Sequence, residues 1–164
     1  MPDEPTEQLR TDIGAFKETI LVTHATDGGL HGRPMAIAGH EEERVLWLVT
    51  SRSSPKVEEI AQDGRVLLTM QGKGRFVTLA GTARLVVDED KTAELWSPTW
   101  RVWFSSPQDP ELVLVRVHLE EGAYWDRRGR AGLKAMLQMA ERVVFGADKA
   151  PEADPDQHAR VPID

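Results

Sequence analysis

The 164-residue chain has no cysteine, no long apolar run and fewer positive than negative charges, and each absence excludes a class of protein. Without cysteine there is no disulfide, thiol nucleophile or thiolate metal site. No segment approaches the ~20 apolar residues of a membrane span, so no membrane partner is expected. With 20 Lys and Arg against 27 Asp and Glu, the net charge of −7 argues against the broad positive surface that binds nucleic acid.

Several functional signatures are also missing from the sequence. Residues 1–5 are acidic and contain two prolines, unlike the basic and apolar start of a signal peptide, so a cytoplasmic location is expected. The five histidines lack metal-ligand spacing, no serine lies in a G-x-S-x-G motif, and the P-loop pattern is absent. Metal-dependent and serine hydrolase chemistry are therefore not expected.

The pattern of apolar residues predicts one domain over residues 1–150 and a polar tail over residues 151–164, which could add an edge strand or remain loose. Runs rich in apolar and β-branched residues predict six strands, over residues 19–26, 30–38, 45–50, 65–70, 76–87 and 112–125. Helical periodicity predicts helices over residues 6–19, 54–62, 88–96 and 132–145. Asp27-Gly28-Gly29 and Gly72-Lys73-Gly74 predict hairpins. The fold class is therefore mainly β, a small antiparallel barrel or sheet with flanking helices.

The most informative segment is a strand that ends in hydroxyl side chains and opens a helix. Ser54 and Lys56 lie in the first turn of that helix, where unpaired N–H groups and the positive end of the dipole favour an anion such as phosphate. The alternative is that Ser54 only caps the helix while Arg52 and Lys56 are solvated. Glu58 and Glu59 are interpreted as acidic residues that favour the helix N-terminus.

Arg33 is the second candidate for an anion site. An arginine in mid-strand beside Pro34 is expected at an edge, at a bulge or against a polar ligand. With Lys56 it could complete a two-cation phosphate site. The alternative is a surface arginine on the polar face of a half-exposed strand.

These segments, in this order, resemble the pyridoxamine 5′-phosphate oxidase-like superfamily of FMN-binding split barrels, and within it the general stress protein branch. The resemblance covers roughly residues 9–149. The motifs that carry it are His31-Gly32-Arg33-Pro34-Met35, Leu46-Trp47-Leu48-Val49-Thr50-Ser51 with Ser54-Pro55-Lys56, Leu79-Ala80-Gly81-Thr82-Ala83, Glu94-Leu95-Trp96, Asp109-Pro110 and Tyr124-Trp125-Asp126.

The resemblance implies a six-stranded antiparallel split barrel that forms a homodimer with two flavin sites at the interface. Arg33 and Lys56 would hold the FMN phosphate, assisted by Ser54 and the helix amides. FMN is the expected cofactor and FAD the alternative. The remaining cofactor-binding residues, whose segments would line the ribityl chain and the isoalloxazine ring, are Pro34, Met35, Ala36, Val49, Thr50 and Ser51.

The chain departs from the oxidases of this superfamily in two places. It has Arg75-Phe76 where the oxidases carry an Arg-Gln pair, and His158-Ala159-Arg160 has the wrong order for their Arg-x-His substrate clamp. Oxidation of pyridoxamine phosphate is therefore disfavoured. The expected function is flavin-dependent redox chemistry on a small molecule, with non-catalytic binding of a flavin or another phosphorylated ligand as the alternative. No catalytic residue is predicted.

Tryptophans form a third group of candidates. Trp96, Trp100 and Trp103 have the spacing of one helix face, provided that the segment stays helical. Packing over an open end of the barrel is favoured for them over stacking on a flavin or pairing with a partner chain. Trp47 and Trp125 lie in predicted strands and are expected in the core.

Overall fold

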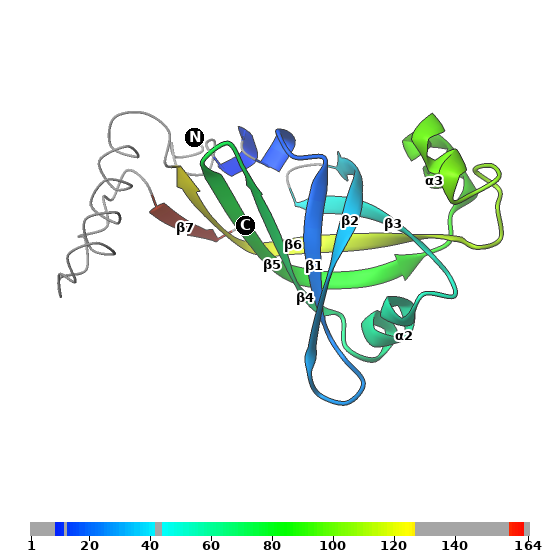
Figure 1. Ribbon diagram of the computed structural model, residues 1–164, viewed down its shortest axis with the longest axis horizontal. Helices are drawn as coiled ribbons and strands as arrows, with labels where there is room; N and C mark the ends of the chain where they lie inside the picture. The colour runs from blue at the N-terminus through cyan, green and yellow to red at the C-terminus, as the bar shows by residue number, and fades with distance from the viewer. Residues whose placement is uncertain (1–8, 12, 42–43, 127–157, 163–164) are drawn as a thin grey trace, which may run out of the picture.

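The computed structural model describes residues 9–11, 13–41, 44–126 and 158–162, and Figure 1 shows how their strands and helices are arranged. Within these residues no helix is long and apolar enough to cross a membrane. Residues 9–11 and 13–14 are helical and a strand begins at Glu18, so the helix predicted over residues 6–19 extends too far. The helix predicted over residues 132–145 lies outside the described residues.

Six antiparallel strands close into a barrel, as predicted. Hydrogen-bonded neighbours follow the order β3-β2-β1-β4-β5-β6, and β3 pairs with β6 to complete the ring. A further strand, β7 (His158–Pro162), pairs with β6, so this part of the predicted tail is an edge strand rather than a loose segment. The six strands of the barrel are β1 (Glu18–His24), β2 (Leu30–Glu41), β3 (Val45–Ser51), β4 (Arg65–Gly72), β5 (Arg75–Val86) and β6 (Leu112–Asp126).

The barrel forms because each of its six strands contributes inward-pointing apolar side chains to one core. Leu21, Leu48, Leu68 and Leu79, from four different strands, have no exposed surface and belong to one continuous core. The predicted β1–β2 and β4–β5 hairpins are confirmed. In the first, Gly28 has φ +88°, a backbone conformation that glycine adopts without strain.

Two helical segments cover the barrel at different places. Helix α2 (Pro55–Gln62) packs against β1 and β5 and is the helix predicted over residues 54–62. Helix α3 (Glu89–Leu95) is followed by a short 3-10 helix, η1 (Pro98–Val102). This second segment contributes to an apolar cluster on the outer side of β3 and β6.

The tryptophan prediction is only partly correct. Trp100 is buried and meets the ring of Trp96 edge-on at 5.7 Å, so it packs against the barrel, but on the outer side of β3 and β6 rather than over an open end as predicted. Trp103 is 65% exposed, because the helix ends before these residues and the spacing of one helix face no longer applies. Trp47 is buried as expected, whereas Trp125 is only half-buried.

Candidate functional site

Strands β2 and β3 separate part way along the barrel. They pair from Glu41 and Val45 up to Ile37 and Leu48, with a bulge between Ile37 and Gly39. A ladder continued in the same register would next pair Ala36 with Val49, Met35 with Thr50 and Pro34 with Ser51. None of these pairs forms. Figure 1 shows β2 running down to the β1–β2 hairpin while β3 runs out toward α2.

Beyond Ile37 and Leu48 the split therefore leaves one backbone edge of β2 and one of β3 that are not paired with each other. On its other side β2 remains paired with β1, and β3 remains paired with β6. Because an unpaired strand edge presents N–H and C=O groups, a ligand in the split can bond to the backbone of both strands. Pro34 lacks an N–H group and suits this unpaired edge, as the sequence pattern indicated.

Arg33 lies beside the split in a hydrogen-bonded cluster. Its Nη1 donates to Oγ1 of Thr23 at 2.5 Å, and its Nη2 donates to the carboxylate of Glu59 at 2.9 and 3.3 Å. Thr23 also donates to Glu59, and Nδ1 of His31 lies 3.2 Å from the same carboxylate. Arg33 is thus neither a solvated surface residue nor an isolated cation, because it is paired with a buried acid.

Lys56 occupies the other side of this site, on the first turn of α2. Its Nζ donates to Oγ1 of Thr50 at 3.0 Å and to Oγ of Ser54 at 2.5 Å. Ser54 stands at the N-cap position, but its side chain makes no capping hydrogen bond. The alternative, in which Ser54 only caps the helix while Arg52 and Lys56 are solvated, is therefore wrong for Ser54 and Lys56, whereas Arg52 is exposed as it expected.

The two cations are close enough to affect each other. Burial and the positive charge of Arg33 lower the pKa of Lys56, while Glu59 acts in the opposite direction. Burial alone would raise the pKa of Glu59. The hydrogen bonds from Thr23, Arg33 and His31, together with the charge of Arg33, outweigh burial and lower that pKa to about 2. Glu59 is consequently ionised at neutral pH, and the three charged groups carry a net charge of about +1.

The structure brings together four of the nine predicted residues, namely Arg33, Thr50, Ser54 and Lys56. The side chains of the other five predicted residues lie outside this cluster, in surroundings that differ from one residue to the next. Met35 is buried in the barrel core, and Val49 is buried in the outer cluster. Ala36 is half-buried on the unpaired edge of β2.

Ser51 and Pro34 point away from the cation cluster. Ser51 donates to Oε2 of Glu111 at 2.9 Å. Pro34 is exposed and lines a second hollow, which lies on the outer face of the barrel. These two positions flank the split through their strands, and their side chains are not part of the cluster around Arg33 and Lys56.

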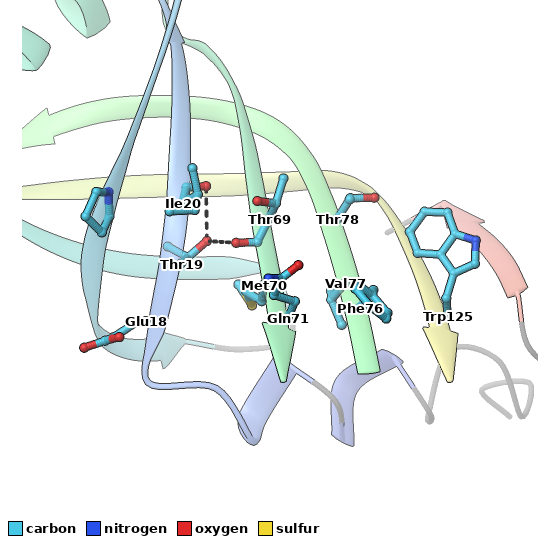
Figure 2. Close-up of a pocket in the computed structure, with 11 residues that line it drawn as sticks. Glu18, Thr19, Ile20, Thr69, Met70, Gln71, Phe76, Val77, Thr78 and Trp125 are labelled. Atoms are coloured by element: carbon cyan, nitrogen blue, oxygen red, sulfur yellow. Dashed lines mark hydrogen bonds between the residues drawn. The ribbon is translucent and has the colours of Figure 1, made fainter. Parts of the chain in front are cut away.

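The outer-face pocket encloses about 640 Å³. Its lining residues come from β1, β2, β4, β5 and β6, and Figure 2 shows the hydroxyl of Thr19 directed at the carbonyl oxygen of Thr69, to which it donates at 3.1 Å. Phe76 and Trp125 lie opposite each other in register and form an aromatic wall. Glu18 is the one charged side chain among the described residues that line it, so these residues are mainly apolar and supply no cation.

Two residues lie in surroundings that differ from the sequence-based prediction. Glu59, expected to favour the helix N-terminus, is only 4% exposed and pairs with Arg33. Its spacing of three from Lys56, which places both on one face of α2, could have indicated this. Trp125, expected in the core, lines the outer-face pocket instead. No local signal distinguishes these two environments in a strand.

Among the described residues, no group of three or more histidine, aspartate or glutamate side chains is arranged to hold a metal ion. The two cations beside the split in the barrel wall have instead the chemistry that suits an anionic ligand.

Comparison with known proteins places this chain in a family. The sequence profile of the family described as pyridoxamine 5′-phosphate oxidase like matches residues 4–150. The chain therefore belongs to the pyridoxamine 5′-phosphate oxidase-like family.

Individual relatives share only about a quarter of their aligned residues with this chain. Protein bli-3 of Neurospora crassa is 25% identical over 137 residues, which cover 73% of this chain and 66%, slightly less than two thirds, of that protein. General stress protein 26 of Bacillus anthracis strain Sterne is 23% identical, with a TM-score of 0.66 over 73% of this chain and 92% of that one. A general stress FMN/FAD-binding protein of Xanthomonas citri is 22% identical, with a TM-score of 0.65 over 77% and 90% of the two chains. The two structures support the same barrel fold.

Proposed function

We propose that this chain binds FMN, with the phosphate between Arg33 and Lys56 and the remainder of the flavin along the split between β2 and β3. The observation that carries this proposal is the position of two cations at the point where the two strands separate. The family and the FMN/FAD-binding relative from Xanthomonas citri support it independently.

The residues present suit a phosphate monoester. Lys56 supplies an ammonium already held by two hydroxyls, and Arg33 has five N–H donors, of which its three hydrogen bonds leave at least two for a ligand. Charge-assisted hydrogen bonds from such groups are among the stronger ones in proteins. The backbone edges of β2 and β3 at the split, which are not paired with each other, offer donors and acceptors to the ribityl hydroxyls and the ring edge.

When bound, FMN supplies the electron transfer itself, so the protein mainly needs to hold and orient it. We propose redox chemistry on a small molecule. Steady-state assays with NADH or NADPH and an electron acceptor distinguish redox turnover from the competing function, which is flavin binding without turnover. Flavin that these donors do not reduce would support binding alone.

We further propose that the chain acts as a homodimer with the flavin sites at the interface. The outer face of β1 and β4 exposes large apolar side chains, with Ile20 40% and Leu67 39% exposed, beside the outer-face pocket. Ile20 lies opposite Thr69 and Leu67 opposite Val22, so these side chains share one face. A second copy would remove this apolar surface from water.

Light scattering at micromolar concentration tests the dimer. The wild type should have twice the mass of the chain, and Leu67→Glu should shift it toward the monomer. Val102→Glu, which changes an apolar residue that is 80% exposed on η1, is the matched control and should remain dimeric. A wild-type monomer that still binds FMN would contradict the interface.

Absorbance spectroscopy tests the cofactor. Purified protein is saturated with FMN or FAD and desalted, and a retained flavin spectrum shifted from that of free flavin is expected. Lys56→Ala should weaken FMN binding by about 1.5–3 kcal/mol, because it removes charge-assisted hydrogen bonds. Arg101→Ala, at an exposed arginine on η1, should not change it. Absence of retained flavin in the wild type would refute the proposal.

A further inference from the structure

The carboxylate of Glu59 is the centre of a network that the binding of an anion does not by itself require. The side chain is 6% exposed and receives hydrogen bonds from Thr23 on β1 and Arg33 on β2. His31, two residues before Arg33, approaches the same carboxylate. A buried carboxylate beside a phosphate site is unfavourable for phosphate binding by charge alone, so its presence needs another explanation.

The geometry at Arg33 supplies that explanation. Both oxygens of Glu59 contact Nη2 of Arg33, while Oγ1 of Thr23 contacts Nη1. The guanidinium is planar and rigid, so contacts on two of its nitrogens fix the direction of the whole group. Lys56 is held differently, because its hydrogen bonds go to the uncharged hydroxyls of Thr50 and Ser54.

We propose that Glu59 is a positioning residue, which holds the Arg33 guanidinium so that its remaining N–H donors meet the phosphate of FMN. This inference rests on the proposed function. Glu59 acts through Arg33 and makes no contact with the ligand. Its value lies in pre-organisation, since an arginine already fixed in place loses less side-chain entropy on binding.

The direction of the mutational effect separates this role from a simple charge effect. Glu59→Gln removes one negative charge from the site, which by electrostatics alone would tighten the binding of a phosphate dianion. Loss of orientation at Arg33 would weaken it. Weaker FMN binding in Glu59→Gln therefore indicates that Glu59 positions Arg33. Tighter FMN binding indicates that the charge of Glu59 acts on the phosphate directly.

The experiment compares FMN with riboflavin, which has the same ring and ribityl chain but no phosphate. In Glu59→Gln we expect FMN affinity to fall by about tenfold or more and riboflavin affinity to change by less than about twofold. Glu58→Gln, at the exposed neighbouring residue, is the matched control and should leave both affinities unchanged. In an Arg33→Met background, Glu59→Gln should cause no further loss of FMN affinity.

Thr23→Val is a second variant that nearly preserves shape. It removes the hydroxyl that bonds to both Arg33 and Glu59, and FMN affinity should fall while riboflavin affinity does not. Unchanged or tighter FMN binding in Glu59→Gln would overturn the positioning role. Equal weakening of FMN and riboflavin would overturn it too, because that result indicates a general loss of structure.

Binding of inorganic phosphate to the wild type and to Glu59→Gln distinguishes a failure of this inference from a failure of the proposed function. If the wild type binds phosphate but not FMN, the proposed function is wrong, and weaker phosphate binding in Glu59→Gln would still support positioning. If phosphate binds equally to both proteins, the positioning role is wrong. If the wild type binds neither FMN nor phosphate, both proposals fall.

Discussion

Replacing Arg33 by methionine should destabilise the protein even without a ligand. The substitution removes the charged partner of Glu59 and leaves a carboxylate with 6% side-chain exposure. The fall in the pKa of Glu59 to about 2, from an ordinary 4.5, corresponds to on the order of 3 kcal/mol in favour of the ionised form. Arg33 contributes both a hydrogen bond and a charge to this effect, so we expect Arg33→Met to lower the free energy of unfolding by about 2 kcal/mol at neutral pH.

The loss of stability in Arg33→Met should become smaller as the pH falls. A carboxyl whose pKa is lowered by folding stabilises the folded state above its unfolded pKa, and this contribution is lost as the pH falls from about 4.5 toward 2. In Arg33→Met the pKa of Glu59 rises, because burial is no longer offset by the guanidinium. The groups that still face this carboxyl are Thr23, His31 and Lys56. The gap in stability between wild type and variant should therefore narrow to less than about half near pH 3.

Urea unfolding followed by tryptophan fluorescence at both pH values measures this gap. Arg65→Met is the matched control, because the side chain of Arg65 is 74% exposed and its ion pair with Asp63 lies at the surface. Such pairs contribute at most about 1 kcal/mol. A change of less than about 0.5 kcal/mol in Arg33→Met at neutral pH, or a loss that is independent of pH, would refute the account of the Arg33–Glu59 pair.

Two further predictions concern the barrel. A Cβ at Gly81 would lie 2.1 Å from the carbonyl oxygen of His118, so Gly81→Ala should lower the free energy of unfolding by about 3 kcal/mol. A Cβ at Gly32 would have its nearest neighbour at 3.5 Å, so Gly32→Ala should change the free energy of unfolding by less than about 1 kcal/mol. Trp100→Ala should lower it by about 3–5 kcal/mol, and Trp103→Ala, at an exposed side chain, by less than about 0.5 kcal/mol. Chemical denaturation measures the stability of all four variants. Similar losses in the two glycine variants, or in the two tryptophan variants, would contradict the packing described for these residues.

The strands and α2 could be predicted because their signals are local. Alternation of apolar residues, glycine turns and a proline at the start of α2 are all present within short segments. The phosphate-site candidates Arg33 and Lys56 were also identifiable, since each stands out in its own segment. The split at their strands was indicated by Pro34, which cannot donate to a neighbouring strand, and was implied by the resemblance to the split-barrel superfamily.

The features that escaped prediction depend on contacts between distant segments. Glu59 looks like any acid early in a helix until β1 and β2 bring Thr23 and Arg33 against it. Trp125 reads as a core residue in a strand, and only the position of β5 and β6 in the barrel places it in the outer-face pocket. The spacing of Trp96, Trp100 and Trp103 suggested one helix, although the helix ends at Leu95.

The central claim is that the cations beside the β2–β3 split recognise the phosphate of a flavin. Calorimetric titration of the wild type and Lys56→Ala with FMN and with riboflavin tests it most directly. The account predicts that the wild type binds one FMN per chain, about tenfold or more tighter than riboflavin, and that Lys56→Ala removes most of this preference. Equal affinity of the wild type for FMN and riboflavin, or an unchanged preference in Lys56→Ala, would contradict it.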